Sequence, residues 1–245
     1  MNHEFFAAGA IGILPALLFL YYALRRYEYP YVEEPLFRND RLFLSFAVGM
    51  IVGVASAVLF NSFNIELYTV ALTVLLATAL FDESFKLVYL NLRFLQRKFD
   101  TVFYGSSLGV GMGATFTMAF AFQTFRGPTA PFHPINIFGL LALSIALNSL
   151  QFFTGSLIGV GSAKGRLWRS YLQALGSRAI FALLIAPFLA PFQVRNPFII
   201  VGFLLAATAF ALFLFWEGHS TIIPESLPAD VRRRLRRGVP KRSSD

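Results

Sequence analysis

Seven apolar stretches, each roughly 20 residues or longer, constrain this chain more than any other feature. A helix needs roughly 20 mainly apolar residues to cross the ~30 Å hydrocarbon layer of a membrane, since each residue adds about 1.5 Å. The stretches do not alternate with a period of two, which favours helices over a β-barrel. The 245 residues are 56% hydrophobic and only 14% charged, a composition that argues against a water-soluble enzyme. We therefore predict an all-α integral membrane protein, a bundle of about seven transmembrane helices at residues 5–24, 42–63, 65–92, 102–125, 135–161, 171–192 and 197–216.

Lys and Arg residues are distributed unevenly between the two sides of such a bundle. If all seven stretches cross, 17 of the 21 Lys and Arg residues fall on the side that carries the C-terminus. The other side receives only Arg126 and Arg195, and Lys86 and Arg178 lie within spans. Because cytoplasmic loops are enriched in basic residues, we predict an N-terminus outside and a C-terminus in the cytoplasm, in a multi-pass protein of the cytoplasmic membrane.

The chain beyond the last span, residues 217–245, is predicted to be a basic cytoplasmic tail that follows a transmembrane domain of residues 1–216. Five arginines stand close together in this tail: Arg232, Arg233, Arg234, Arg236 and Arg237. They could bind anionic lipids, at about 1 kcal/mol per basic residue near the surface, or they could act only as a topological signal. No aromatic platform or recognition motif accompanies them, so we do not expect nucleic-acid binding.

Glycines gather in the second, fourth and fifth spans. Gly105, Gly109 and Gly113 are spaced by four residues and therefore line one face of the fourth span. In lipid, small residues let helix backbones approach closely. We expect these three spans to form the interior of the bundle, with the glycine face serving helix packing.

Polar residues inside the spans form a second group of candidates. Asp82, Glu83 and Lys86 share one face of the third span, because residues three and four apart are neighbours on a helix. The sixth span carries Arg178, and an unpaired charge in the membrane is costly, so we expect Arg178 to pair with Asp82 or Glu83. With two amides at mid-depth of the fifth span, Asn148 and Gln151, these residues would form an intramembrane polar cluster. Such a cluster could simply join the helices, or it could border a cavity that opens to the cytoplasm and binds a peptide, a lipid or an ion.

Metal-binding side chains are scarce. The chain has no cysteine and only three histidines, at His3, His133 and His219, none of which lies within a predicted span. Zinc sites in proteins are built mainly from Cys, His and carboxylate ligands. We therefore predict no metal and no cofactor.

Two motifs in this chain resemble those of the PrsW-type intramembrane proteases, which are distantly related to the CAAX-processing endopeptidases. The segment Asp82-Glu83-Ser84-Phe85-Lys86 is similar to the Glu-Glu-x-x-Lys motif of that family, with Asp82 in place of a glutamate. About 20 residues further on, residues 104–112 resemble its Tyr-Gly-x-x-x-Gly-x-Gly-Phe stretch. The likeness covers about 110 residues across the third to sixth spans. It implies cleavage of membrane proteins within or beside the bilayer, by water activated with a carboxylate or a metal.

The chain departs from this family's pattern at other positions. A Glu-Asn pair that follows the glycine-rich stretch in the family is Phe116 and Thr117 here. The family's later histidines align loosely with Asn148 or Gln151, and with Arg178. Ala182 stands where a polar partner is usual. We therefore assign no catalytic residue, although an active protein would use Glu83 with Asp82 and Lys86.

Three functions follow from these observations. The first is a PrsW-like protein that is not catalytic and binds a membrane-protein partner, a peptide or a lipid, or serves as a subunit of a membrane complex. The second is an active intramembrane endopeptidase that uses Glu83. The third, motivated only by the charges within the spans, is a transporter or channel.

Overall fold

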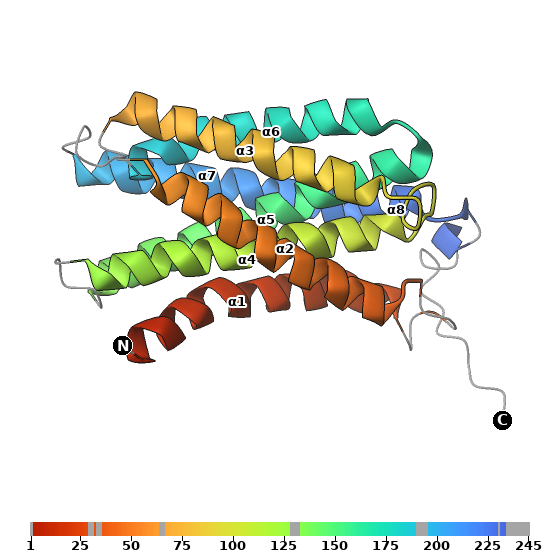
Figure 1. Ribbon diagram of the computed structural model, residues 1–245, viewed down its shortest axis with the longest axis horizontal. Helices are drawn as coiled ribbons and strands as arrows, with labels where there is room; N and C mark the ends of the chain where they lie inside the picture. Colours follow the sequence, from red (N-terminus) through yellow and green to blue (C-terminus); the bar gives the residue numbers. More distant parts are fainter. Residues whose placement is uncertain are drawn as a thin grey trace.

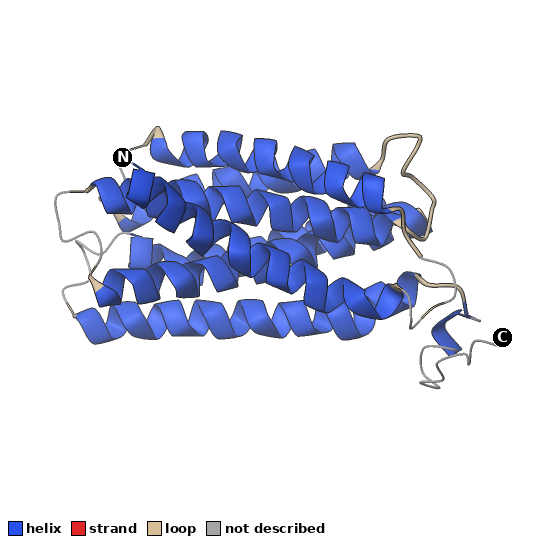
Figure 2. Ribbon diagram, turned by 90° about the horizontal axis from the view of Figure 1, so that it is seen from below, coloured by secondary structure: helices blue, strands red, loops and turns tan. Residues whose placement is uncertain are grey.

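The computed structural model describes residues 2–28, 32, 36–63, 67–127, 133–189, 196–229 and 231–233, and all regular structure in these ranges is helical. Seven long helices run roughly parallel to one long axis (Figures 1 and 2). They are α1 (Asn2–Leu24), α2 (Asn39–Asn61), α3 (Tyr68–Leu90), α4 (Thr101–Arg126), α5 (Pro134–Lys164), α6 (Leu167–Leu189) and α7 (Pro197–Glu217). A 3-10 turn, η1 (Arg25–Tyr27), follows α1. The predicted spans agree with these helices to within four residues at each end.

Six of the long helices are apolar enough to cross a membrane, judged by length and composition. The exception is α3, which is 23 residues long, as α2 and α6 are, but carries Asp82, Glu83 and Lys86. Large apolar side chains such as Ile51 and Phe198 are exposed on the outside of the bundle, where lipid would cover them. The fold is therefore that of a helical, multi-pass membrane protein, and the seventh crossing stays a prediction.

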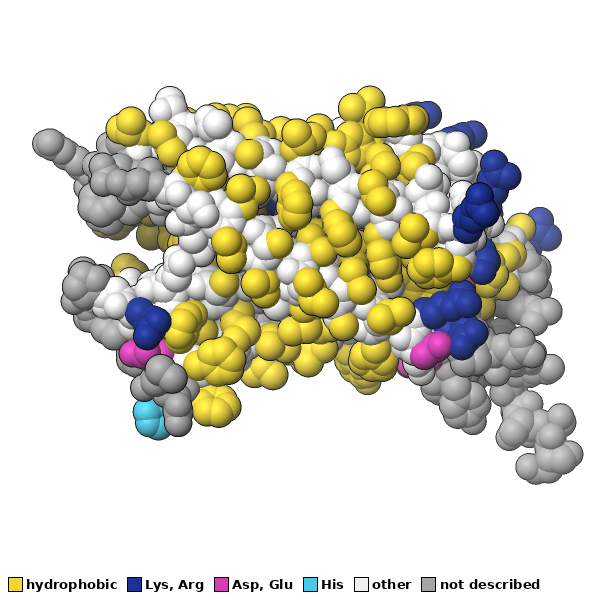
Figure 3. Space-filling view, viewed as in Figure 1, with side chains coloured by type: hydrophobic (Ala, Val, Ile, Leu, Met, Phe, Trp, Pro, Cys, Tyr) yellow, Lys and Arg dark blue, Asp and Glu magenta, His cyan; other side chains and the backbone are white. Residues whose placement is uncertain are grey.

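Exposed basic side chains gather at one end of the bundle (Figure 3). We call this the basic end, and it includes Arg25, Arg93, Lys98, Lys164 and Arg166. The middle of the same face is mainly apolar (Figure 3), and the C-terminal end of α7 lies at the basic end (Figure 1). The predicted orientation depends on this separation of the basic end from the apolar middle of the bundle. The direction of insertion remains a prediction.

Helices α4 and α5 lie at the centre of the bundle, and close backbone contacts join them. A Cβ atom on Gly109 would overlap the carbonyl oxygen of Gln151, and one on Gly105 would overlap the carbonyl oxygen of Gly155. A Cβ on Gly113 would stand 2.8 Å from Asn148 Oδ1. The three glycines spaced by four thus all face α5, and their lack of side chains permits the contact.

Helix α2 approaches α4 in the same way. A Cβ on Gly49 would overlap the carbonyl oxygen of Leu108, and one on Gly111 would overlap that of Phe46. The second, fourth and fifth spans therefore pack together as their glycine content led us to expect. The central helix α5 ends after Lys164 because Gly165 adopts the left-handed conformation, with φ +69°.

Helical structure continues beyond residue 217, the predicted start of the basic tail. Helix α7 continues into a π-helical turn, η2 (Gly218–Ile222), and then into the short helix α8 (Ile223–Ser226). The side chains of His219, Ile222 and Ile223 are buried. Residues 218–227 thus belong to the folded bundle, because their apolar side chains pack on it. Of the five clustered arginines, Arg232 and Arg233 are described, whereas the other three, at positions 234, 236 and 237, lie outside the described residues.

Candidate functional site

Helix α3 turns its three ionisable side chains toward the inside of the bundle. Asp82 is 2% exposed, and Glu83 and Lys86 are fully buried. The spacing of three and four residues places all three on one helix face, and that face packs against α5 and α6. Charges in this position need partners within the protein, since neither lipid nor apolar side chains can solvate them.

Lys86 has a protein partner for each of its three donor hydrogens. Its Nζ lies 2.8 Å from Glu83 Oε1 and 2.7 Å from Thr154 Oγ1, and it also donates to Gln151 Oε1. An ammonium group has three donors and no acceptor, so these contacts use its full capacity. Lys86 does not extend to the basic end of the bundle, and it joins α3 to α5.

Arg178 forms the ion pair that the cost of a buried charge led us to expect. Its Nη2 donates to Asp82 Oδ2 at 2.6 Å, and its Nε lies 3.6 Å from Glu83 Oε1. Asp82 also accepts hydrogen bonds from Gln151 Nε2, at 2.9 Å, and from the hydroxyl of Ser56. Asp82 thus contacts helices α2, α5 and α6 at once.

The formal charges of this network cancel, because two carboxylates face one ammonium and one guanidinium group. Attraction between such charges is strong where the surroundings are apolar, and it opposes the cost of removing them from water. Two buried polar atoms of the network have no hydrogen-bond partner, namely Glu83 Oε2 and Arg178 Nε. The network is balanced in charge but retains one free acceptor and one free donor.

Asn148, the other amide of the predicted polar cluster, forms its hydrogen bonds within α5. Its Nδ2 donates to the carbonyl oxygen of Ser144 at 2.9 Å and approaches Ser144 Oγ at 3.2 Å. The Ser144 hydroxyl in turn donates to the carbonyl oxygen of Ile11 on α1. Asn148 thus bonds within α5 and lies against Gly113 of α4, whereas Gln151 bonds to Lys86 and Asp82 of α3.

The network also includes two residues that sequence reasoning missed, Ser56 on α2 and Thr154 on α5. Thr154 stands three residues after Gln151, so helix periodicity could have placed the two side chains on one face. Ser56 has no such signal, because many small hydroxyl residues occur in the spans. Only the packing of α2 against α3 brings its hydroxyl to Asp82.

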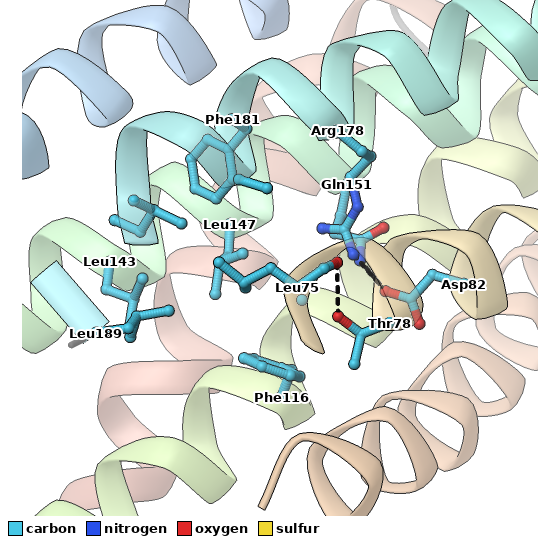
Figure 4. Close-up of a pocket in the computed structure, with 13 residues that line it drawn as sticks. Leu75, Thr78, Asp82, Phe116, Leu143, Leu147, Gln151, Arg178, Phe181 and Leu189 are labelled. Carbon is cyan, nitrogen blue, oxygen red and sulfur yellow. Dashed lines mark hydrogen bonds and ion pairs between the residues drawn. The ribbon is translucent and has the colours of Figure 1, made fainter. Parts of the chain in front are cut away.

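A small cavity, with ≈20 Å³ of room for the centre of a water molecule, lies between α3, α4, α5 and α6. Figure 4 shows Asp82, Gln151 and Arg178 together at one end of it and leucine and phenylalanine side chains along the rest. Its walls are formed by Leu75, Thr78, Asp82, Gly113, Phe116, Leu143, Leu147, Gln151, Arg178, Phe181, Ala182, Ile185 and Leu189. Neither Glu83 nor Lys86 lines this space.

The direction of the cavity differs from the one expected. From Asp82 it follows α3 back to Leu75, and from Arg178 it follows α6 forward to Leu189, the last residue of that helix. Both directions lead away from the basic end. The lining residues therefore extend from the Asp82–Arg178 ion pair toward the end of the bundle opposite the basic end.

The positions that depart from the protease pattern lie on or next to this cavity. Phe116 and Ala182 form part of its wall, and Thr117 donates its hydroxyl hydrogen to the carbonyl oxygen of Gly113 on its own helix. Arg178 occupies the polar end. The arrangement places apolar atoms and a cation near Asp82 rather than further acids or imidazoles.

Histidines lie away from the network. His3 and His133 are exposed, and His133 caps the start of α5 by accepting from the backbone N–H of Ile135 at 3.4 Å. His219 is buried in η2, where its ring stacks on Phe215 of α7 at a centroid distance of 6.3 Å. Within the described ranges, no three His, Asp or Glu side chains come together as a metal-binding group.

Comparisons with known proteins give no match. No family model matches the chain, and neither a curated protein nor a solved structure matches it.

Proposed function

We propose that this chain is a PrsW-like multi-pass protein of the cytoplasmic membrane that does not catalyse proteolysis. It binds a lipid or a membrane-protein partner through the space between α3, α4, α5 and α6, or serves in this way as a subunit of a membrane complex. In this proposal all seven long helices cross the membrane, the N-terminus is outside and the basic end faces the cytoplasm. The arginines near the C-terminus would then lie beside anionic lipids.

The observation that carries the proposal is the mutual neutralisation of the four charged side chains. A general base must be able to reach a water molecule and the bond to be cleaved. Glu83 is fully buried, is held by Lys86 at 2.8 Å, and does not border the cavity. Asp82 borders the cavity, but Arg178 and Gln151 both donate to its Oδ2. The carboxylates are thus engaged in holding helices together.

Catalysis by an acid also needs groups that position water and stabilise developing negative charge. The polar groups of the cavity wall beside Asp82 are already engaged, because Gln151 and Arg178 donate to Asp82 and Thr78 donates to the carbonyl oxygen of Leu75. The rest of the wall, with Leu147 and Phe181, suits an apolar group, since ligand sites are mainly apolar with a few polar groups that fix orientation. Binding is therefore better supported than hydrolysis.

An active intramembrane endopeptidase is the second candidate, and one observation favours it. Glu83 Oε2 is a buried acceptor without a partner, and a water molecule could fill that role. In that case Glu83 would act as the base.

A proteolysis assay separates the two functions. The purified protein is reconstituted in lipid vesicles with a mixture of transmembrane peptides, and cleavage is followed by mass spectrometry beside the Glu83→Gln variant. We expect no cleavage that depends on Glu83. Turnover by the original protein that is lost in Glu83→Gln, with folding of the variant verified by circular dichroism, would overturn the proposal.

A further inference from the structure

We infer that Tyr22, Arg25 and Arg26, where α1 reaches the basic end, bind the phosphate headgroup of an anionic phospholipid. The headgroup is a phosphate monoester, and the acyl chains lie along the exposed face of α1. This surface is separate from the charged network on α3. The inference goes beyond the proposed function, because it depends only on the position of α1 at the membrane surface and applies whether or not the chain cleaves proteins.

Three hydrogen-bond donors stand together at this end of α1. Tyr22 belongs to the last turn of α1, and Arg25 and Arg26 follow in η1. Residues three and four apart are neighbours on a helix, so both arginines lie on the side of Tyr22. The Cζ atom of Arg25 stands over the Tyr22 ring, 4.9 Å from its centroid. All three side chains are exposed, and they form one donor surface.

The two arginines of this surface have no counter-ion. Within the part of the chain that the structure describes, neither the guanidinium group of Arg25 nor that of Arg26 forms an ion pair or a hydrogen bond, and the Tyr22 hydroxyl forms none either. Arg38, by contrast, pairs with Asp40 at 2.7 Å. The donors at the end of α1 are therefore free to bind an anion.

The end of α7 and the turn η2 hold Tyr22 in place. Its ring lies 5.5 Å from that of His219 and 6.4 Å from that of Phe215, measured between centroids. Both of these partners are buried. Because Tyr22 in turn contacts Arg25, the donor surface is partly arranged before a ligand arrives, and less conformational freedom is lost on binding.

An apolar row continues from this surface along α1. Leu18 and Leu14 precede Tyr22 by four and eight residues, so they share its helix face, and they are 67% and 57% exposed. From Leu14 to Arg25 the helix rises by about 16 Å, which is about half of the ~30 Å hydrocarbon layer. A phospholipid has the same arrangement, with a charged head above apolar chains. A free phosphate ion would use only the polar end, so the surface suits a lipid better.

The number of charges selects the kind of headgroup. A phosphate monoester carries about −1.5 to −2 charges at pH 7 and has three strong acceptor oxygens. Arg25 and Arg26 together offset that charge, and guanidinium groups bind phosphate through paired hydrogen bonds. The Tyr22 hydroxyl adds a further donor. A phosphate diester carries a single negative charge and leaves one arginine without compensation.

Native mass spectrometry of the purified full-length chain in detergent micelles tests the choice of ligand. The probes are dioleoyl phosphatidate, a monoester, and the diesters dioleoyl phosphatidylglycerol and dioleoyl phosphatidylcholine. We expect phosphatidate to bind about fivefold or more tightly than phosphatidylglycerol, with phosphatidylcholine weakest. Equal affinities for phosphatidate and phosphatidylglycerol would overturn the selection of a monoester. Displacement of phosphatidate by an excess of inorganic phosphate would overturn the assignment to a lipid.

A pair of double variants locates the site. Arg25→Gln with Arg26→Gln should weaken phosphatidate binding about tenfold or more, because it removes both cations. The control, Arg93→Gln with Arg97→Gln, removes two exposed arginines from the connection between α3 and α4 and should change binding less than about twofold. Equal weakening by the two double variants would mean general attraction by the basic end, and would overturn the inference.

Two single variants test the geometry of the surface, with folding verified by circular dichroism. Tyr22→Phe keeps the ring and its contacts but removes the hydroxyl, so phosphatidate binding should weaken about threefold. Arg25→Lys keeps the charge but loses the paired hydrogen bonds, and it should weaken binding even if the double variant does not fold. Unchanged phosphatidate affinity in both single variants would contradict a site built from these donors.

Discussion

Asp82→Leu is the substitution that most directly tests the buried network. It removes the acceptor for Arg178 Nη2, Gln151 Nε2 and the Ser56 hydroxyl. Ser56 keeps a bond to the carbonyl oxygen of Val52, so its loss is small. Gln151 is left with an unsatisfied buried donor, at about 1–3 kcal/mol. Arg178 is left as a buried cation whose remaining carboxylate is that of Glu83, 3.6 Å away.

From these losses we expect Asp82→Leu to lower the free energy of unfolding by about 3–5 kcal/mol, the range for breaking one side of a buried ion pair. Arg178→Met should cause a loss of similar size, since Asp82 then has no cation. The double variant should lose less than the two singles together, with a coupling energy of about 1–3 kcal/mol, because it leaves neither charge alone.

The assay is unfolding in mixed micelles of increasing sodium dodecyl sulfate content, followed by near-ultraviolet circular dichroism. The chain contains its own control in the pair Arg38–Asp40, which has the same chemistry and a similar distance of 2.7 Å, but both side chains are more than 60% exposed. Asp40→Leu should therefore have far less effect than Asp82→Leu. Two results would refute the conclusion that the buried ion pairs hold the helices together. One is an additive loss of unfolding free energy in the double variant, and the other is an equal loss at positions 40 and 82.

Two further predictions concern packing and topology. Gly109→Ala should destabilise the chain by about 1–3 kcal/mol, because its Cβ would overlap the carbonyl oxygen of Gln151, whereas Gly202→Ala, which meets no atom within 4 Å, should stabilise it by about 0.5–1 kcal/mol. The same unfolding assay measures both, and equal effects would contradict the close contact of α4 and α5. Since the chain has no cysteine, a membrane-impermeant maleimide should label Ser62→Cys in intact cells but Arg93→Cys only after permeabilisation. Labelling of both variants from the same side would show that α3 does not cross.

The sequence alone determined where the helices of this protein lie and which kinds of contact some of their side chains make. Long apolar stretches can satisfy their backbone groups in lipid only as helices, so the helix boundaries follow closely from composition. A charge within such a stretch must find a partner, so the pairing of Arg178 with an acid on α3 was predictable. The spacing of Gly105, Gly109 and Gly113 likewise indicated one close helix contact.

Tertiary structure decided how these parts meet. Periodicity assigns a residue to a face of its own helix but does not say which neighbour that face contacts. Asn148 and Gln151 are three residues apart, yet Asn148 bonds within α5 and Gln151 bonds to α3, and the hydroxyl of Ser56 reaches Asp82 only because α2 packs beside α3. The course of the cavity, away from the basic end, depends in the same way on the relative positions of four helices. Such positions are set by contacts between side chains distant in sequence, which no local pattern records.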